Sequence, residues 1–86
     1  MEEAITVEAP TALLGFLLTL KLPEHDARVV EFPDGRFAVE VAADAPREWV
    51  LGRVRRWLDE ESLQQAVVHV DRESYTVTPA GTSFSD

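Results

Sequence analysis

The segment from Ala12 to Leu22 constrains the fold more than any other part of the sequence, because it lies between two prolines and is almost entirely apolar. Pro10 stands before the segment, Pro23 follows it, and Lys21 is its only charged residue. Proline is tolerated at the first position of a helix and ends a helix that reaches it. The segment is much shorter than the roughly 20 residues of a membrane span, so we predict a helix of a soluble domain that opens at Pro10.

Two stripes of large apolar residues run along this predicted helix at the helical period. The stripe that we expect to face the core contains Leu13, Phe16, Leu17 and Leu20. The other stripe contains Leu14, Leu18 and Leu22. A chain of 86 residues builds one thin core and has little with which to cover a second apolar face. We therefore expect the second stripe to be exposed for self-association or partner binding, unless loop 23–27 or the C-terminal tail covers it or the helix lies deep between its neighbours.

Residues 28–42 contain the clearest local signal, two runs of alternating apolar and polar residues that predict a β-hairpin. If Asp34 and Gly35 form a two-residue turn, one face collects the apolar residues Val30, Phe32, Phe37, Val39 and Val41. If Gly35 is instead a bulge after a type I turn, one face collects Phe32, Arg36, Ala38 and Glu40. We predict the first register because it separates apolar from charged side chains, although Pro33 favours the second.

The remaining segments predict further strands and a second helix. Residues 4–8 alternate between apolar and polar types and predict a first strand. Asp44 or Ala45, directly before Pro46, predicts the N-cap of the second helix. Residues 66–78 alternate on both sides of a turn over residues 71–74 and predict a second hairpin.

This order of elements, β-α-β-β-α-β-β, predicts an α+β domain. Two right-handed βαβ units joined by a hairpin give the ferredoxin-like βαββαβ two-layer sandwich, here with an additional C-terminal edge strand. We expect a single domain over residues 1–78 and a disordered tail over residues 79–86. The alternative order is αββαββ, in which residues 1–9 are a tail. Because this architecture carries many unrelated activities, it does not by itself predict a function.

The charge balance excludes several kinds of partner. Sixteen Asp and Glu residues against eight Lys and Arg residues give a net charge of −8, and a negative protein repels nucleic-acid phosphates and anionic lipid surfaces. We therefore expect no nucleic-acid partner and no membrane partner. The absence of cysteine excludes disulfides and cysteine-ligated metals, and it fits a cytoplasmic location.

The second predicted helix has an unusual outer side. Its expected core stripe contains Val50, Leu51, Val54, Trp57 and Leu58. Trp49 falls on the opposite side with Arg53 and Arg56, where a guanidinium group one turn away can stack on the indole ring. Tryptophan and arginine are enriched at binding hot spots, so this patch is a second candidate site. The alternative is an ordinary solvated helix face.

Sequence motifs for catalysis and cofactor binding are absent. The chain has no Gly-x-Ser-x-Gly, His-Glu-x-x-His or phosphate-binding glycine loop, and no serine stands near both a histidine and an acid in the sequence. Residues 24–26, and His69 beside Glu8 or Glu40, offer too few ligands for a metal site. We predict no cofactor and no metal, and the balance leans against an enzyme.

These features favour a non-catalytic protein-interaction or regulatory module. We expect it to form a homo-oligomer, or to bind another protein, through Leu14, Leu18 and Leu22. The alternative hypothesis is a small domain that binds an anionic ligand through Trp49, Arg53 and Arg56.

Overall fold

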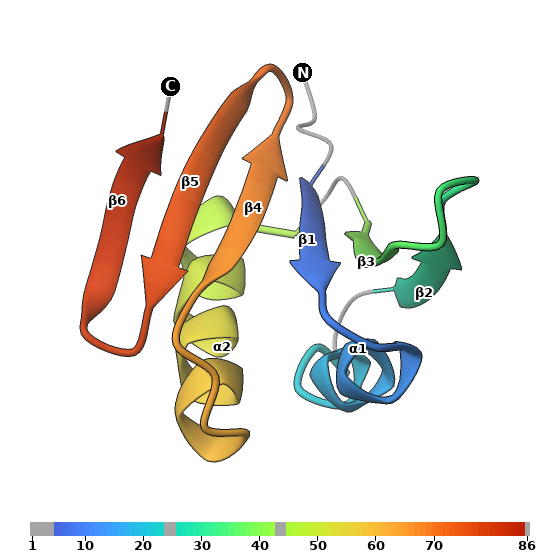
Figure 1. Ribbon diagram of the computed structural model, residues 1–86. Helices are drawn as coiled ribbons and strands as arrows, with labels where there is room; N and C mark the ends of the chain where they lie inside the picture. Colours follow the sequence, from blue (N-terminus) through green and yellow to red (C-terminus); the bar gives the residue numbers. More distant parts are fainter. Residues whose placement is uncertain (1–4, 24–25, 43–44, 86) are drawn as a thin grey trace.

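The computed structural model describes residues 5–23, 26–42 and 45–85, which form two helices and six strands (Figure 1). In chain order the elements are β1 (Ile5–Ala9), α1 (Ala12–Thr19), β2 (Ala27–Glu31), β3 (Phe37–Val41), α2 (Arg47–Glu60), β4 (Ala66–Val70), β5 (Glu73–Thr78) and β6 (Gly81–Ser85). The predicted α+β class is confirmed.

The six strands form one sheet in the order β2-β3-β1-β4-β5-β6, and every neighbouring pair is antiparallel. β1 lies in the interior, paired with β3 on one side and β4 on the other. Its residues alternate as the sequence predicts, since Ile5, Val7 and Ala9 are buried and Thr6 and Glu8 are not. The alternative order with residues 1–9 as a tail is therefore wrong.

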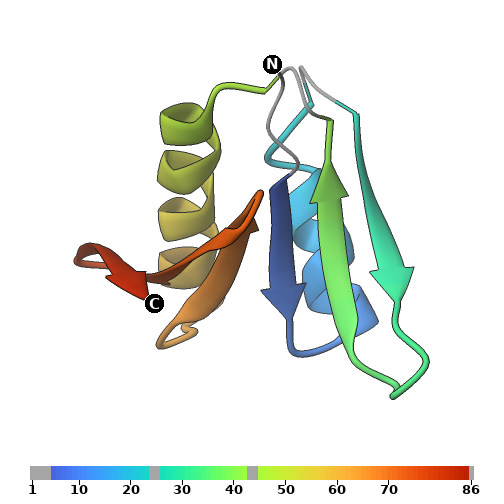
Figure 2. The same ribbon diagram turned by 90° about the horizontal axis from the view of Figure 1, so that it is seen from above.

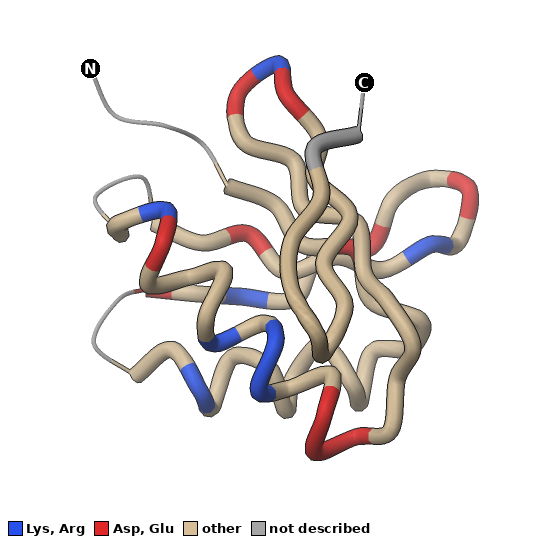
Figure 3. Tube along the Cα trace, turned by 90° about the vertical axis from the view of Figure 1, so that its left-hand side faces the viewer, with Lys and Arg blue, Asp and Glu red and all other residues tan. Residues whose placement is uncertain are grey.

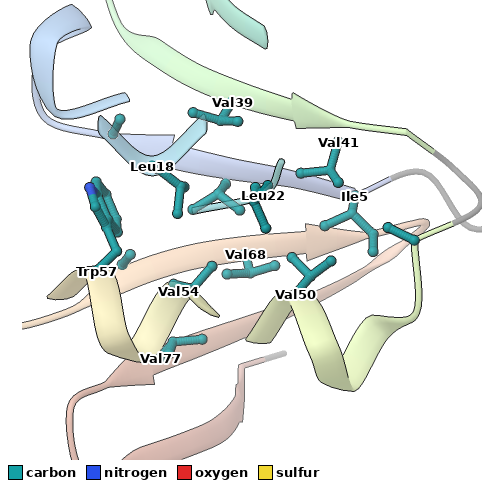
Figure 4. Close-up of a cluster of buried hydrophobic side chains, with 14 of the residues drawn as sticks. Ile5, Leu18, Leu22, Val39, Val41, Val50, Val54, Trp57, Val68 and Val77 are labelled. Carbon is teal, nitrogen blue, oxygen red and sulfur yellow. The ribbon is translucent and has the colours of Figure 1, made fainter. Parts of the chain in front are cut away.

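Both helices pack on one side of the sheet (Figures 1 and 2). Side chains from both helices and from the sheet meet in one apolar core (Figure 4). Trp57 of α2 is fully buried there, and its indole N–H donates a 2.9 Å hydrogen bond to the carbonyl oxygen of Leu14 in α1. This bond joins the two helices directly. In the part of the chain that the structure describes, no helix covers the other side of the sheet.

The orientation of α1 is the opposite of the predicted one. Leu18 and Leu22, placed in the exposed stripe by the sequence analysis, are fully buried, and Leu14 is half-buried against the core. Of the predicted core stripe, Leu13, Phe16 and Leu20 are 67%, 53% and 59% exposed, and Leu17 alone packs against the core, where it is half-buried. The prediction of an exposed face at Leu14, Leu18 and Leu22 is therefore wrong.

A glycine explains this orientation. Gly15 lies on the same side of α1 as Leu18, and a Cβ atom at position 15 would stand 3.3 Å from Cγ2 of Val29 and 3.4 Å from Cγ2 of Val39. The helix thus approaches β2 and β3 most closely along its glycine side, where no side chain intervenes. Both leucine stripes are apolar, so the smallest residue, and not the most apolar stripe, decides which side faces the sheet.

The register of the β2–β3 hairpin also differs from the predicted one. Val29 pairs with Val39 and Val30 pairs with Ala38, so Val29 faces the helices and Val30 the open side. Gly35 has a φ of +89° and its N–H donates to the Phe32 carbonyl oxygen, as expected for a bulge after a turn over residues 33–34. Because β2 has valines at both 29 and 30, either register offers an apolar face, and the turn decides.

Two helix starts differ from the predicted ones. The N-cap of α1 is Thr11, whose hydroxyl oxygen accepts a 3.1 Å hydrogen bond from the N–H of Leu14, so the helix opens after Pro10 and not at it. The N-cap of α2 is Pro46, which has no side-chain cap hydrogen bond. The predicted cap Ala45 lies outside the helix, and the other predicted cap, Asp44, lies outside the described residues.

The C-terminal segment is a strand and not the predicted disordered tail. Gly81–Ser85 pair with β5 from Thr78 back to Ser74, so β6 is the edge and β5 is an interior strand. The hydroxyl oxygen of Thr78 accepts a 3.2 Å hydrogen bond from the N–H of Gly81. This bond closes the two-residue connection between the strands, a feature that the small polar composition of the segment concealed.

Candidate functional site

The most unusual surface of the molecule is the outer face of α1, which we define as Leu13, Phe16 and Leu20. These three are the exposed large hydrophobic residues of the part of the chain that the structure describes. No charged residue interrupts them, because α1 contains none. A helix that is apolar all round is normally buried all round, and contiguous exposed apolar residues mark interaction surfaces.

The helical segments carry most of the positive charge of the protein. Five of the eight basic residues lie on or directly after the helices (Figure 3), namely Lys21, Arg47, Arg53, Arg55 and Arg56. Lys21 forms an ion pair with Glu60 at the end of α2. The hydrogen bond from Lys21 holds the pKa of the Glu60 carboxyl below its usual value, against the opposing effect of desolvation. The helical side is therefore much less negative than the net charge of −8 suggests.

The predicted stacking of Arg53 on Trp49 is confirmed, with the guanidinium carbon 5.0 Å from the centroid of the indole ring. Trp49 is half-buried and also packs against the core, so part of its role is structural. The third predicted member, Arg56, is exposed, and its Nε lies 3.7 Å from Oε2 of Glu60. Beside this patch, Arg47 donates a 3.0 Å hydrogen bond to the Tyr75 hydroxyl.

A second cluster, absent from the sequence analysis as a unit, lies on the open side of the sheet. His69 of β4 stands between Glu8 of β1 and Ser74 of β5. Its Nε2 is 2.6 Å from Oε2 of Glu8, and its Nδ1 is 2.9 Å from Oγ of Ser74. His69 was expected near Glu8 from the sequence, whereas no serine was expected close to both a histidine and an acid.

Only part of the signal for this cluster was present in the strand pattern. Ser74 is the cross-strand partner of His69 in the β4–β5 hairpin, whereas the predicted hairpin placed Ser74 in a turn over residues 71–74. The observed turn contains only Asp71 and Arg72. Glu8 joins them only because β1 pairs with β4, with Thr6 opposite His69. Pairing of strands so distant in the sequence does not follow from local patterns.

Other ionic contacts and hollows lie away from the outer face of α1. Across β2 and β3, Arg28 and Glu40 form an exposed pair at 3.0 Å. A hollow of about 490 Å³ lies beside this pair, and one of about 380 Å³ lies beside Glu8 and Arg36. In the β2–β3 turn, a backbone hydrogen bond and an ion pair from Arg36 hold the pKa of Asp34 below its usual value. Trp49 and Arg53 line neither hollow.

Among the described residues, no group of three or more acidic or histidine side chains is placed to hold a metal ion. Glu24 and His25, the first two members of the loop triplet in the sequence, lie outside the described residues. No helix in the described ranges is long and apolar enough to cross a membrane. Comparisons with protein-family models, with curated proteins and with solved structures find no match to this chain.

Proposed function

We propose that the protein is a non-catalytic interaction module that self-associates through the outer face of α1. The observation that carries this proposal is the exposure of Leu13, Phe16 and Leu20 on one face of an uncharged helix. Burial of apolar surface stabilises by roughly 25 cal/mol per Å², so covering this face with a partner favours the associated form. The residues differ from those expected from the sequence, but the helix is the same.

A second copy of the chain is the partner that the charge distribution favours. Two molecules with a net charge of −8 repel one another over most approaches, and repulsion is smallest where acids and bases balance locally. The helical side meets this condition, because most of the basic residues lie there and α1 itself carries no charge. Contact of the same face on both copies about a two-fold axis gives a closed dimer.

The size of the face sets the expected strength of the dimer. A helix of eight residues rises about 12 Å, and three side chains on it cover much less than the roughly 800 Å² per partner of a stable interface. We therefore expect a reversible dimer with a dissociation constant in the micromolar range or weaker. It becomes the main species only at high protein concentration.

Two finer points belong to the same proposal. The order β2-β3-β1-β4 with the helices on one side supports a ferredoxin-like unit extended at one edge by β5 and β6. We also propose a cytoplasmic location, because the chain contains no cysteine.

The test is the mass of the protein in solution, measured by sedimentation velocity across the micromolar to millimolar range. We expect the native mass to rise towards a dimer with concentration, and the double variant Leu13→Gln/Leu20→Gln to stay a monomer. Val30→Thr, on the open side of the sheet, is the matched control and should associate like the native chain. A native protein that stays monomeric throughout, or a double variant that still dimerises, would overturn the proposal.

The second candidate function is the binding of a small anion at Trp49, Arg53 and Arg56, supported by the stacked pair. Each arginine already has a neighbour, since Arg53 covers the indole ring and Arg56 lies near Glu60. An anion that displaces Arg53 should change the Trp49 fluorescence, and Arg53→Ala should abolish the change. Phosphates and carboxylates that leave the emission unaltered would remove this candidate.

A further inference from the structure

The cluster of Glu8, His69 and Ser74 has the connections of an activated nucleophile. An acid, an imidazole and a hydroxyl lie in a hydrogen-bonded row, with 2.6 Å between Glu8 and Nε2 and 2.9 Å between Nδ1 and Ser74. A base within hydrogen-bond reach of a hydroxyl, and itself oriented by a third group, is the general arrangement for activating a serine. The three residues come from β1, β4 and β5, so the sheet holds them in place.

The direction of each hydrogen bond follows from the chemistry of the groups. An ionised carboxylate only accepts hydrogen bonds, so in the neutral imidazole the proton lies on Nε2 and is donated to Glu8. Nδ1 then carries the lone pair and faces Oγ of Ser74. The Ser74 hydroxyl therefore donates its proton towards a base that is free to take it. The ring nitrogens have exchanged places relative to the usual serine–histidine–acid triad, but each group keeps its role.

We propose that Ser74 is a reactive serine that accepts acyl groups from small activated esters, with His69 as the general base and Glu8 as a positioning residue. Oγ of Ser74 forms a bond with the acyl carbon while the ester C–O bond breaks. The hydroxyl proton passes to Nδ1 of His69 and then to the departing oxygen. The products are an acyl-serine at position 74 and the free alcohol or phenol.

The exposure of the cluster determines which acyl donors fit. The side chains of His69 and Glu8 are 41% and 36% exposed, and they lie on the side of the sheet that no described helix covers. Small acyl donors can therefore reach the hydroxyl group, and little selects among them. A positioned general base contributes about 10²- to 10⁴-fold, which sets the expected advantage of Ser74 over an ordinary serine.

The test compares two serines on the same side of the sheet. The native chain is incubated with p-nitrophenyl acetate, and the acetylated residues are located and timed by mass spectrometry. Ser83 of β6, exposed and opposite Thr76, is the internal reference. We expect Ser74 to be acetylated about 10²-fold faster than Ser83, and His69→Gln to reduce the rate at Ser74 to that of Ser83. Equal rates at the two serines, or an unchanged rate in His69→Gln, would overturn the proposal.

The role of Glu8 is tested by a signal that packing alone does not move. Nitrogen-15 NMR of the His69 ring should show the proton on Nε2 in the native chain, and a mixture of tautomers in Glu8→Ala. Glu8→Gln keeps an acceptor oxygen and should restore both the tautomer and part of the acetylation rate. A native ring with its proton on Nδ1 would also overturn the proposal. These readouts are independent of self-association and can fail separately from it.

Discussion

α1 and α2 pack against the same core, but only one of them could be oriented from its sequence. α2 carries charged residues along its outer side, and Val50, Val54, Trp57 and Leu58 are buried as predicted. α1 carries no charge, and its predicted and observed orientations are opposite. Hydrophobic periodicity reports which side of a helix is polar. Where neither side is polar, close approach to the sheet at Gly15 decides instead.

The largest effect on stability is expected from substitutions of the two tryptophans in α2. Trp57 is fully buried and bonded to Leu14, whereas Trp49 is half-buried beneath Arg53. We expect Trp57→Ala to lower the free energy of unfolding by about 3–5 kcal/mol, and Trp49→Ala by about 1 kcal/mol. Urea unfolding followed by circular dichroism measures both. Similar losses in the two variants would mean that both tryptophans belong equally to the core.

The next test asks which stripe of α1 is the core side. Leu18→Ala removes a fully buried side chain and should cost about 2–5 kcal/mol. Leu13→Ala removes an exposed one and should stay within about 0.5 kcal/mol of the native chain at concentrations that keep it monomeric. The predicted orientation of α1 requires the reverse order, so thermal unfolding of these two variants decides between the orientations.

A smaller effect comes from the glycine inside each helix. A methyl group at Gly52 meets nothing within 4 Å, so Gly52→Ala should stabilise the protein by about 0.5–1 kcal/mol through helix propensity. A methyl group at Gly15 would press on Val29 and Val39, so Gly15→Ala should show no gain. If both substitutions raised the free energy of unfolding equally, Gly15 would not be the residue that lets α1 pack closely on the sheet.

The smallest effect is the dependence of stability on pH through the pair that links the ends of the helices. The folded pKa of Glu60 lies below its usual value of 4.5 because Lys21 donates to it. Its stabilisation is therefore present above that pH and is lost as the pH falls through the folded pKa. Lys21→Met should flatten this acid loss in a pH series of urea unfolding, and Lys21→Arg should preserve it. Parallel acid losses in the native chain and in Lys21→Met would show that the pair is energetically silent.

The parts of the fold that follow from the sequence are those with one dominant local signal. The strand at β1, the existence of both hairpins, the core side of α2 and the stack of Arg53 on Trp49 all have such a signal. The register of β2 does not, because adjacent valines at 29 and 30 allow two solutions. Nor does β6, whose small polar residues pair with β5 along the backbone and show no apolar alternation.

The two candidate sites were also poorly predicted, because neither has one dominant local signal in the sequence. The outer face of α1 was assigned to the wrong residues because two apolar stripes compete within it. The cluster of Glu8, His69 and Ser74 was missed as a unit because Ser74 was assigned to the turn of the second hairpin, whereas it lies in β5 opposite His69. The approach of His69 to Glu8, about sixty residues apart in the sequence, was expected. Sequence spacing describes neighbours along the chain, whereas this site is made by neighbours across the sheet.

The interior position of β1 has a consequence for how the chain folds. β1 belongs with α1, β2 and β3 in the first half of the sequence, yet it also pairs with β4 of the second half. The two strands lie side by side at the middle of the sheet (Figure 1). The Trp57 bond to Leu14 and the pair of Lys21 with Glu60 also join the two halves. Closing so long a loop costs entropy before those contacts form. We therefore expect the formation of the β1–β4 pair, which closes the longest loop between paired strands, to limit the folding rate.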